Sequence, residues 1–153
     1  MNDLYRDLAP ITSGAWEAIE DEARQALEAM LAARRLVDFE GPLGWQASSV
    51  DLGRTRDVQS PRAGAEARLR RVQPLVEVRV PFTLSRREIG ALERGARDSE
   101  LGPVVEAART AAMAEDGAVF NGFADAGITG IMAGATNDAI SLTSDYTRYP
   151  EAA

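Results

Sequence analysis

Apolar side chains recur every three or four residues along segment 14–36, which is the period of an amphipathic helix. Ser13 or Thr12 can cap its first turn with a side-chain oxygen. Acidic residues crowd the first half, and Arg34 and Arg35 close the segment, an order that suits the helix dipole. We expect one helix with an apolar stripe formed by Trp16, Ile19, Ala23, Leu27, Met30 and Leu31, with Arg34 as its polar exception.

Segment 45–73 shows no helical period. Short β-type runs at 48–52, 55–58 and 65–69 are separated by Gly53, Pro61 and Gly64, which predicts a β-hairpin arm. The arm is too polar to bury much of its own surface, so we expect it to need a partner surface. A flexible surface loop is the alternative interpretation.

Segment 75–82 alternates between apolar and charged positions, as a half-buried strand does. Pro74 and Pro81 either place this strand at a sheet edge or bound its ends. Its apolar positions are Val76, Val78, Val80 and Phe82, and its charged positions are Glu77 and Arg79.

Helical signals return after this strand. Ser85 and Glu88 match a capping box, so we expect a short helix that ends near Gly95. A longer helix should begin at Pro103 and run towards Ala126, with close packing or a bend at positions 117 and 122, which are glycines. A further helix is expected to begin near position 150.

The composition removes several kinds of chemistry. The chain of 153 residues has no cysteine and no histidine, which excludes disulfides, thiolate catalysis, the usual zinc sites and an imidazole base. No apolar run reaches the length of a membrane span and no secretory signal is visible, so we expect a cytoplasmic protein without a membrane partner. These features favour a structural or binding role, and no catalytic, metal-binding or cofactor-binding residue is predicted.

Charge is distributed unevenly along the chain. The net charge is −7, which disfavours nucleic acid as the main partner. Segment 54–87 nevertheless holds nine arginines and three acidic residues and carries +6, which leaves −13 for the remainder. This segment is either a solvated basic surface or a basic arm that docks on an acidic surface of another copy.

Adjacent carboxylates offer the one route to catalysis that the composition leaves. Glu115 and Asp116 are neighbours on the longer predicted helix and therefore point to different faces, which makes them a poor general acid/base pair. We interpret them as solvated or structural charges and expect that the protein is not an enzyme.

Several stretches, in order along the chain, together resemble the encapsulin family of linocin-type shell proteins, which is related to the capsid proteins of tailed phages. The stretches are Leu4-Tyr5-Arg6-Asp7-Leu8-Ala9-Pro10, Arg34-Arg35-Leu36-Val37-Asp38, Gly41-Pro42-Leu43-Gly44-Trp45, Pro74-Leu75-Val76-Glu77-Val78-Arg79, Pro81-Phe82-Thr83-Leu84, Leu92-Glu93-Arg94-Gly95 and Glu115-Asp116 followed by Phe120 and Gly122.

The resemblance implies an α+β fold of the HK97-like phage capsid type, present in part. Residues 1–44 would form the N-terminal arm and cargo-facing helix, residues 45–74 the extended loop that reaches over a neighbouring subunit, and residues 75–153 a partial peripheral domain with its spine helix. Family members carry a further C-terminal segment with the axial domain, which is expected to be missing here. We expect this half to assemble poorly unless that segment, supplied as a separate chain if necessary, completes the sheet over the 75–82 strand.

The resemblance also implies a function, that of a shell protomer that assembles with other copies and encloses a cargo protein. Family cargoes include peroxidases and ferritin-like proteins, and they carry a C-terminal targeting peptide that lies between the N-terminal helix and the peripheral domain. The runner-up function is a phage-type capsid protein that packages nucleic acid. Some family shells bind a flavin beside a tryptophan, but Arg87 stands at that position here, so no cofactor is expected, and Trp16 and Trp45 are interpreted as packing residues.

Helical spacing places Leu27, Met30, Leu31 and Arg34 on one face, with Leu36 and Asp38 at the helix exit. The resemblance makes these six the expected cargo-peptide-binding residues, in which Arg34 and Asp38 would pair with charges or backbone of the peptide. The alternative is that Leu27 and Leu31 are ordinary core residues and that Arg34 and Asp38 form an exposed i,i+4 ion pair.

Overall fold

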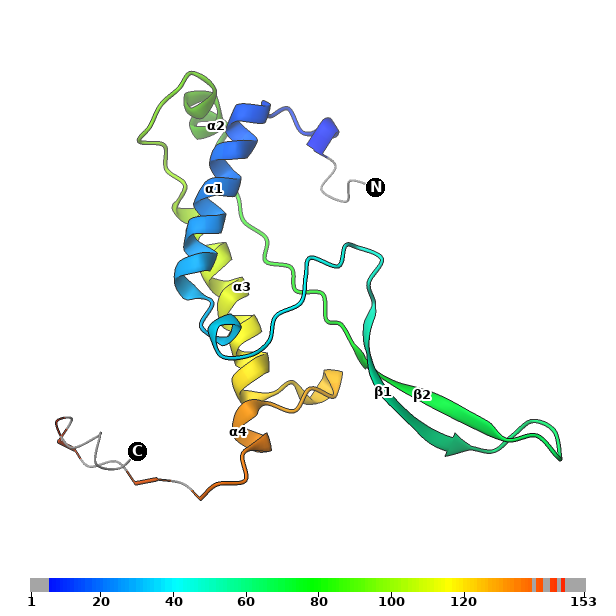
Figure 1. The fold of residues 1–153 in the computed structure, drawn as a ribbon. Coiled ribbons are helices and arrows are strands. Elements are labelled where there is room, and N and C mark those ends of the chain that lie inside the picture. The colour runs from blue at the N-terminus through cyan, green and yellow to red at the C-terminus, as the bar shows by residue number, and fades with distance from the viewer. Residues whose placement is uncertain (1–5, 139, 142–143, 146, 148–153) are drawn as a thin grey trace.

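The protein is an α+β chain in which a helical body carries a long two-stranded hairpin that projects away from it, as the computed structural model shows (Figure 1). The structure describes residues 6–138, 140–141, 144–145 and 147. The helix expected near position 150, and part of the matched stretch at positions 4–10, lie outside the described residues.

Helix α1 (Ser13–Met30) begins as the sequence predicts, with the Thr12 hydroxyl accepting a hydrogen bond from the backbone N–H of Ala15 at 3.4 Å. It ends earlier than predicted, because Leu31 is extended and a short 3₁₀ helix, η2 (Ala33–Arg35), follows. The prediction of one helix over 14–36 is therefore wrong in its last turn.

The early end has a physical cause in the competition for backbone hydrogen bonds. The N–H groups of Ala32 and Ala33 donate to the two carboxylate oxygens of Asp116, each at 3.0 Å, instead of to carbonyls of the preceding turn. The Arg35 guanidinium donates to the carbonyl of Glu28 at 3.2 Å and so satisfies one acceptor that the missing turn leaves open.

Helix α3 (Gly102–Asn121) lies alongside α1 and forms the body of the molecule with it (Figure 1). Small side chains dominate this contact, which lets the two backbones approach closely. The buried apolar residues of the described chain are Ala15, Ile19, Ala33, Val104, Ala108 and Ala112.

Helix α2 (Arg86–Glu93) forms where the sequence predicts it. The Ser85 hydroxyl accepts a hydrogen bond from the N–H of Glu88 at 3.1 Å, which confirms the Ser85 half of the predicted capping box. The Glu88 carboxylate accepts from the N–H of Glu100 at 3.1 Å and so ties the first turn of α2 to the loop before α3. The chain leaves α2 through Gly95, whose φ of 87° is the left-handed conformation of a helix end.

Helix α3 begins with Pro103 in its first turn as predicted, but it ends at Asn121 and not near Ala126. Gly122 has a φ of 89°, and a Cβ atom placed on it would lie 2.8 Å from the backbone nitrogen of Gly130. The chain therefore turns at Gly122 and passes through η3 (Ala124–Ala126). It then runs back past Gly122 and forms the single turn α4 (Ile131–Gly134).

The predicted hairpin arm is confirmed as an element. Strand β1 (Ser49–Val58) pairs antiparallel with β2 (Ala67–Pro74), in a register that runs from Ser49 opposite Pro74 to Val58 opposite Ala67. A bulge between Asp51 and Arg54 contains Gly53, whose φ of 64° few other residues would adopt. Gln73 donates to the carbonyl of Ala126 at 2.9 Å and anchors the base of the hairpin on the body.

The predicted half-buried strand over 75–82 is not formed within the described part of the chain. The backbone there is extended, but it has no strand partner, and Val78 is 50% exposed. The last hydrogen bond of the hairpin is donated by the N–H of Leu75 to the carbonyl of Ser48, at 2.9 Å. Beyond it, the segment that precedes β1 turns away between Gly44 and Ala47. Alternation of side chains selects an extended backbone, whereas a strand also requires a neighbouring strand.

The two tryptophans differ. Trp16 is half-buried under the Arg6 guanidinium, which lies 4.9 Å from the ring centroid, so its interpretation as a packing residue holds. Trp45 is 65% exposed, and its interpretation as a packing residue is wrong for the single chain. It belongs to segment 39–46, which runs as an exposed connection to the hairpin, and it stands in the wall of an open hollow beside Leu75 and Val76.

Candidate functional site

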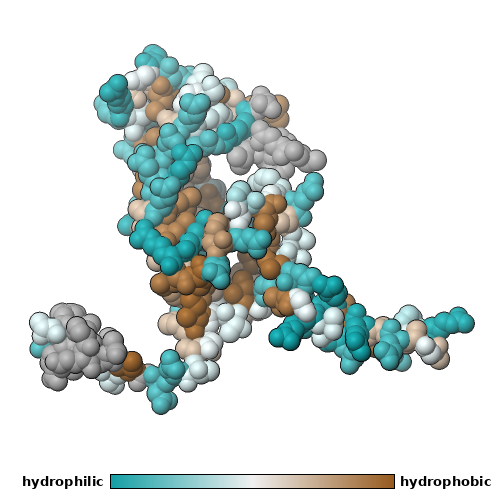
Figure 2. All heavy atoms as spheres, in the orientation of Figure 1, coloured by the Kyte–Doolittle hydropathy of each residue, from teal (hydrophilic) through white to brown (hydrophobic). Residues whose placement is uncertain are grey.

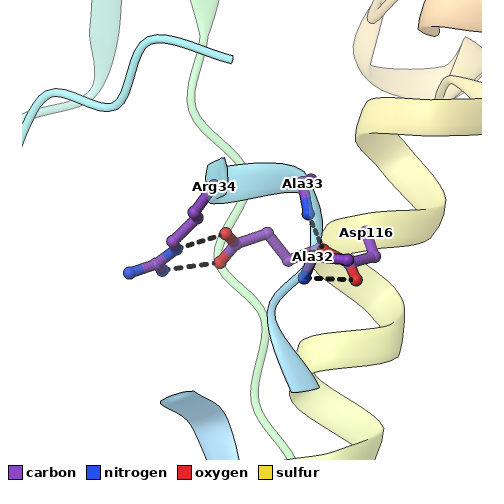
Figure 3. A network of polar contacts seen from close by, with 5 residues as sticks. Ala32, Ala33, Arg34 and Asp116 are labelled. Carbon is purple, nitrogen blue, oxygen red and sulfur yellow. Dashed lines mark hydrogen bonds and ion pairs between the residues drawn. The ribbon is translucent and has the colours of Figure 1, made fainter. Parts of the chain in front are cut away.

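Arg34 and the acidic pair at the middle of α3 form a polar junction between the end of α1 and the long helix (Figure 3). The Nε and Nη2 atoms of Arg34 donate to the two carboxylate oxygens of Glu115, at 2.5 and 2.7 Å. Asp116 receives the N–H groups of Ala32 and Ala33. Two successive residues of α3 therefore bind segment 32–34: Glu115 binds its arginine side chain, and Asp116 binds its backbone.

The Arg34 guanidinium is held on two sides. Its central carbon lies 4.3 Å from the centroid of the Phe39 ring, a cation–π distance, while Glu115 binds its edge. The hydrogen bonds to Glu115 raise the pKa of Arg34 above its ordinary value, and the charge of Asp116 adds to this, against a lowering by partial burial. Arg34 is a fixed positive charge at any physiological pH.

An open apolar groove, which we call the helix groove, lies on one side of this junction. It has a volume of about 520 Å³. Leu27 of α1 and Val76 and Val78 of the extended segment line it together with the small residues of α3. The remaining lining residues are Arg34, Ala111, Ala114, Glu115, Ala118, Val119, Phe123 and Ile128.

A second groove, which we call the loop groove, adjoins it and has a volume of about 370 Å³. Its walls come from segment 33–43, from the base of the hairpin at Val50 and from Leu75. Arg34, Glu115 and Val119 line both grooves, so the ion pair stands between them. Figure 2 shows apolar side chains gathered on the helical body and hydrophilic residues covering the projecting hairpin.

Of the six residues that the sequence analysis expects to bind the cargo peptide, three line the grooves and three do not. Leu27 and Arg34 line the helix groove, and Arg34 and Asp38 line the loop groove. Met30, Leu31 and Leu36 line neither, and Leu36 is 70% exposed. The prediction that Leu31 and Arg34 share a helix face with Leu27 is wrong, because α1 ends at Met30.

The alternative hypothesis of an Arg34–Asp38 ion pair is also wrong. The guanidinium of Arg34 binds Glu115, which lies 81 residues away in the sequence. This leaves Asp38 as an acidic side chain in the wall of the loop groove.

Sequence reasoning missed the contribution of α3 to these grooves. Glu115 was interpreted as a solvated or structural charge, and Val119 was not singled out, yet both line both grooves. Phe39 was not singled out. The available signal was the three-residue and four-residue spacing of Ala111, Glu115 and Ala118, which places them on one side of a helix.

The described residues carry no group of three or more acidic, cysteine or histidine side chains arranged to hold a metal ion. Within the same part of the chain, no helix combines the length and apolar character needed to cross a bilayer. Glu115 and Asp116 are each occupied by a separate structural contact, so they do not form an acid/base pair.

Comparison with known proteins identifies the family. The family model described as encapsulating protein for peroxidase matches residues 1–153. A type 1 encapsulin shell protein of Rhodospirillum rubrum is 55% identical over 98% of this chain and 56% of its own length. Proteins of the same name from Mycobacterium tuberculosis and Brevibacterium linens are 46% and 45% identical over 99% of this chain, and the match covers 57% of each.

The chain therefore belongs to the encapsulin family. It spans a little over half of the length of the curated relatives that it matches.

Proposed function

We propose that this chain is a structural protomer of an encapsulin shell that assembles with other copies into a closed HK97-like cage in the cytoplasm and encloses a cargo protein. The protein does its work by association and catalyses no reaction. Membership of the encapsulin family supports the proposal, and so does the similarity to relatives that are named as shell proteins.

The projecting hairpin is the observation on which the proposal depends. Both strands are exposed along nearly their whole length, and the hairpin meets the body only at its base (Figure 1). An isolated two-stranded hairpin is at best marginally stable in water. A long hairpin of this kind is suited to lie on a neighbouring subunit, which is the role of an intersubunit clasp.

We further propose that the helix groove and the loop groove together receive the targeting peptide of the cargo. Both grooves are open and mostly apolar, which suits aliphatic side chains of an extended peptide. Arg34 uses two of its five N–H groups on Glu115, so three N–H groups are left to donate to backbone carbonyls of the peptide. Asp38 can accept peptide N–H groups from the opposite wall.

Among the six residues named from the sequence, this proposal gives direct contacts to Leu27, Arg34 and Asp38. The groove geometry adds Val76 and Val119. The cargo would be of the peroxidase or ferritin-like type, as the description of the family suggests for peroxidase.

The test is retention of a fluorescent protein that carries a family targeting peptide, co-expressed with the protein produced from its complete coding sequence. We expect the double variant Arg34→Ala, Asp38→Ala to retain less than about a tenth of the cargo, which corresponds to a loss above 1.4 kcal/mol. Arg35→Ala is the matched control, because Arg35 contacts only the Glu28 carbonyl and lines neither groove. Undiminished cargo in intact shells of the double variant would contradict the proposed groove.

A further inference from the structure

The two faces of the hairpin differ in how their charges are arranged. Residues opposite each other in an antiparallel pair point to the same face, and alternate pairs point to opposite faces. The register therefore assigns Asp51, Asp57, Arg68 and Arg70 to one face, and Arg54, Arg56 and Arg71 to the other.

The first of these, the balanced face, neutralises itself. Arg70 forms an ion pair with Asp51, and Arg68 lies 3.2 Å from Asp57. Arg68 also lies 3.8 Å from Glu66, so two arginines meet three carboxylates and this face offers no excess positive charge to a partner.

The second, the arginine face, carries three arginines and no acidic residue. Arg54, Arg56 and Arg71 are exposed, and within the described chain no carboxylate is paired with any of their side chains. Leu69 stands opposite Arg56 and is 49% exposed. Nearer the body, the same face holds Val50, which lines the loop groove, and Gln73, which donates a hydrogen bond to the Ala126 carbonyl.

The arginine face also contains a contact that weakens the hairpin itself. Arg54 lies directly opposite Arg71, and like charges at opposite positions destabilise a strand pair. A pair of this kind does not help the hairpin to fold, which points to a use outside the single chain.

We propose that the arginine face of the hairpin binds an acidic surface on a second copy of this chain and determines which side of the hairpin faces the neighbour. The inference rests on the proposed shell function. Segment 49–74 holds six arginines and three acidic residues and carries +3, which leaves −10 for the rest of a chain with a net charge of −7. The remainder of a second copy is therefore opposite in net charge to the arginine face, which favours their association.

The same charges argue against nucleic acid as the occupant. A duplex that approached three arginines would also approach a body with a strong negative charge, which repels phosphates. Three exposed arginines and a leucine on one face fit an interface with a protein, where arginine is enriched and an apolar residue adds burial.

The test compares two double variants with the same change in net charge on the same hairpin, in the protein produced from its complete coding sequence. Arg54→Gln, Arg71→Gln removes the facing pair of the arginine face, and Arg68→Gln, Arg70→Gln removes both arginines of the balanced face. Assembly is followed by sedimentation velocity against protein concentration at about 50 mM and about 500 mM salt, between which screening of exposed charges rises strongly. Nucleic acid is measured by absorbance of the purified particles.

We expect Arg54→Gln, Arg71→Gln to raise the concentration for half-assembly by about tenfold or more at low salt and to abolish most of its salt dependence. The balanced-face variant should remain within about threefold of the unsubstituted protein. Loss of the like-charge pair should not weaken the hairpin, and protection of its amides from hydrogen exchange should confirm that it is still formed.

Equal assembly of the two variants, with the same salt dependence, would overturn this inference and leave the shell function standing. Unchanged assembly together with loss of bound nucleic acid from the arginine-face variant would overturn it in favour of a nucleic-acid surface. An unsubstituted protein that forms no higher species at any concentration would contradict both the inference and the proposed function.

Discussion

Asp116 uses one carboxylate to hold two consecutive backbone N–H groups, those of Ala32 and Ala33, at 3.0 Å each. Ala33 is fully buried, so its N–H could not turn to water if the carboxylate were lost. At the scale of single residues, this contact fixes where the N-terminal helix ends and where Arg34 points.

We expect Asp116→Ala to lower the free energy of unfolding by about 1–3 kcal/mol, because a charge-assisted contact is removed and a buried donor is left without an acceptor. Urea unfolding of the chain measures this. Glu106→Ala is the control on the same helix, since Glu106 makes only a loose, exposed ion pair with Arg109 at 3.9 Å, and its loss should cost less than about 0.5 kcal/mol. Equal losses in the two variants would show that Asp116 does not hold the segment.

At this scale the sequence predicts what is local and misses what is distant. The cap at Ser85 follows from two residues three positions apart, and it forms as expected. The partner of Arg34 does not follow from any local pattern, because Glu115 comes close only when α1 and α3 pack together. The alternative interpretation, an Arg34–Asp38 ion pair, was wrong for this reason.

Helices α1 and α3 are held together by a contact in which alanines predominate. Ala15, Ala108 and Ala112 are nearly inaccessible to water, so little room is left for larger side chains at these positions. At the scale of elements, this close approach sets the distance between Arg34 and Glu115 and so the position of both grooves.

We expect Ala112→Leu to destabilise the chain by about 1–3 kcal/mol, because three further carbon atoms must be placed between closely packed helices. The neighbouring Met113 points to solvent, so Met113→Leu is the control and should leave the unfolding free energy nearly unchanged. Urea unfolding again provides the measurement, and an Ala112→Leu variant as stable as the control would show that the two helices do not pack as described.

The prediction of elements succeeded where the interacting segments are neighbours in the sequence. It failed where an element depends on contacts with a distant segment. The hairpin supplies both of its strands, and its two β-type runs and glycines were sufficient to predict it. The alternation at Val76 and Val78 correctly indicates an extended backbone, but a strand needs a second strand, and none lies beside it within the described residues. The end of α1 was missed because a carboxylate from another helix competes for its last N–H groups.

At the scale of the whole molecule, the apolar grooves and the arginine face occupy different parts of the structure. The helix groove and the loop groove lie around the Arg34–Glu115 junction on the body, whereas the arginine face lies on the hairpin, which projects away from the body (Figure 1). The first arrangement suits capture of a short peptide and the second suits contact between copies. The family could be predicted from stretches of sequence spread over the chain, whereas the face of the hairpin that carries the free arginines required the register.

The central claim is that the protein functions by association through a hairpin that does not fold back on its own body. Electron microscopy of the protein produced from its complete coding sequence tests this most directly, with particle mass measured by light scattering. We predict uniform closed shells in which density for the 49–74 hairpin crosses onto an adjacent subunit. A monodisperse monomer with that hairpin packed against its own helices would contradict the account.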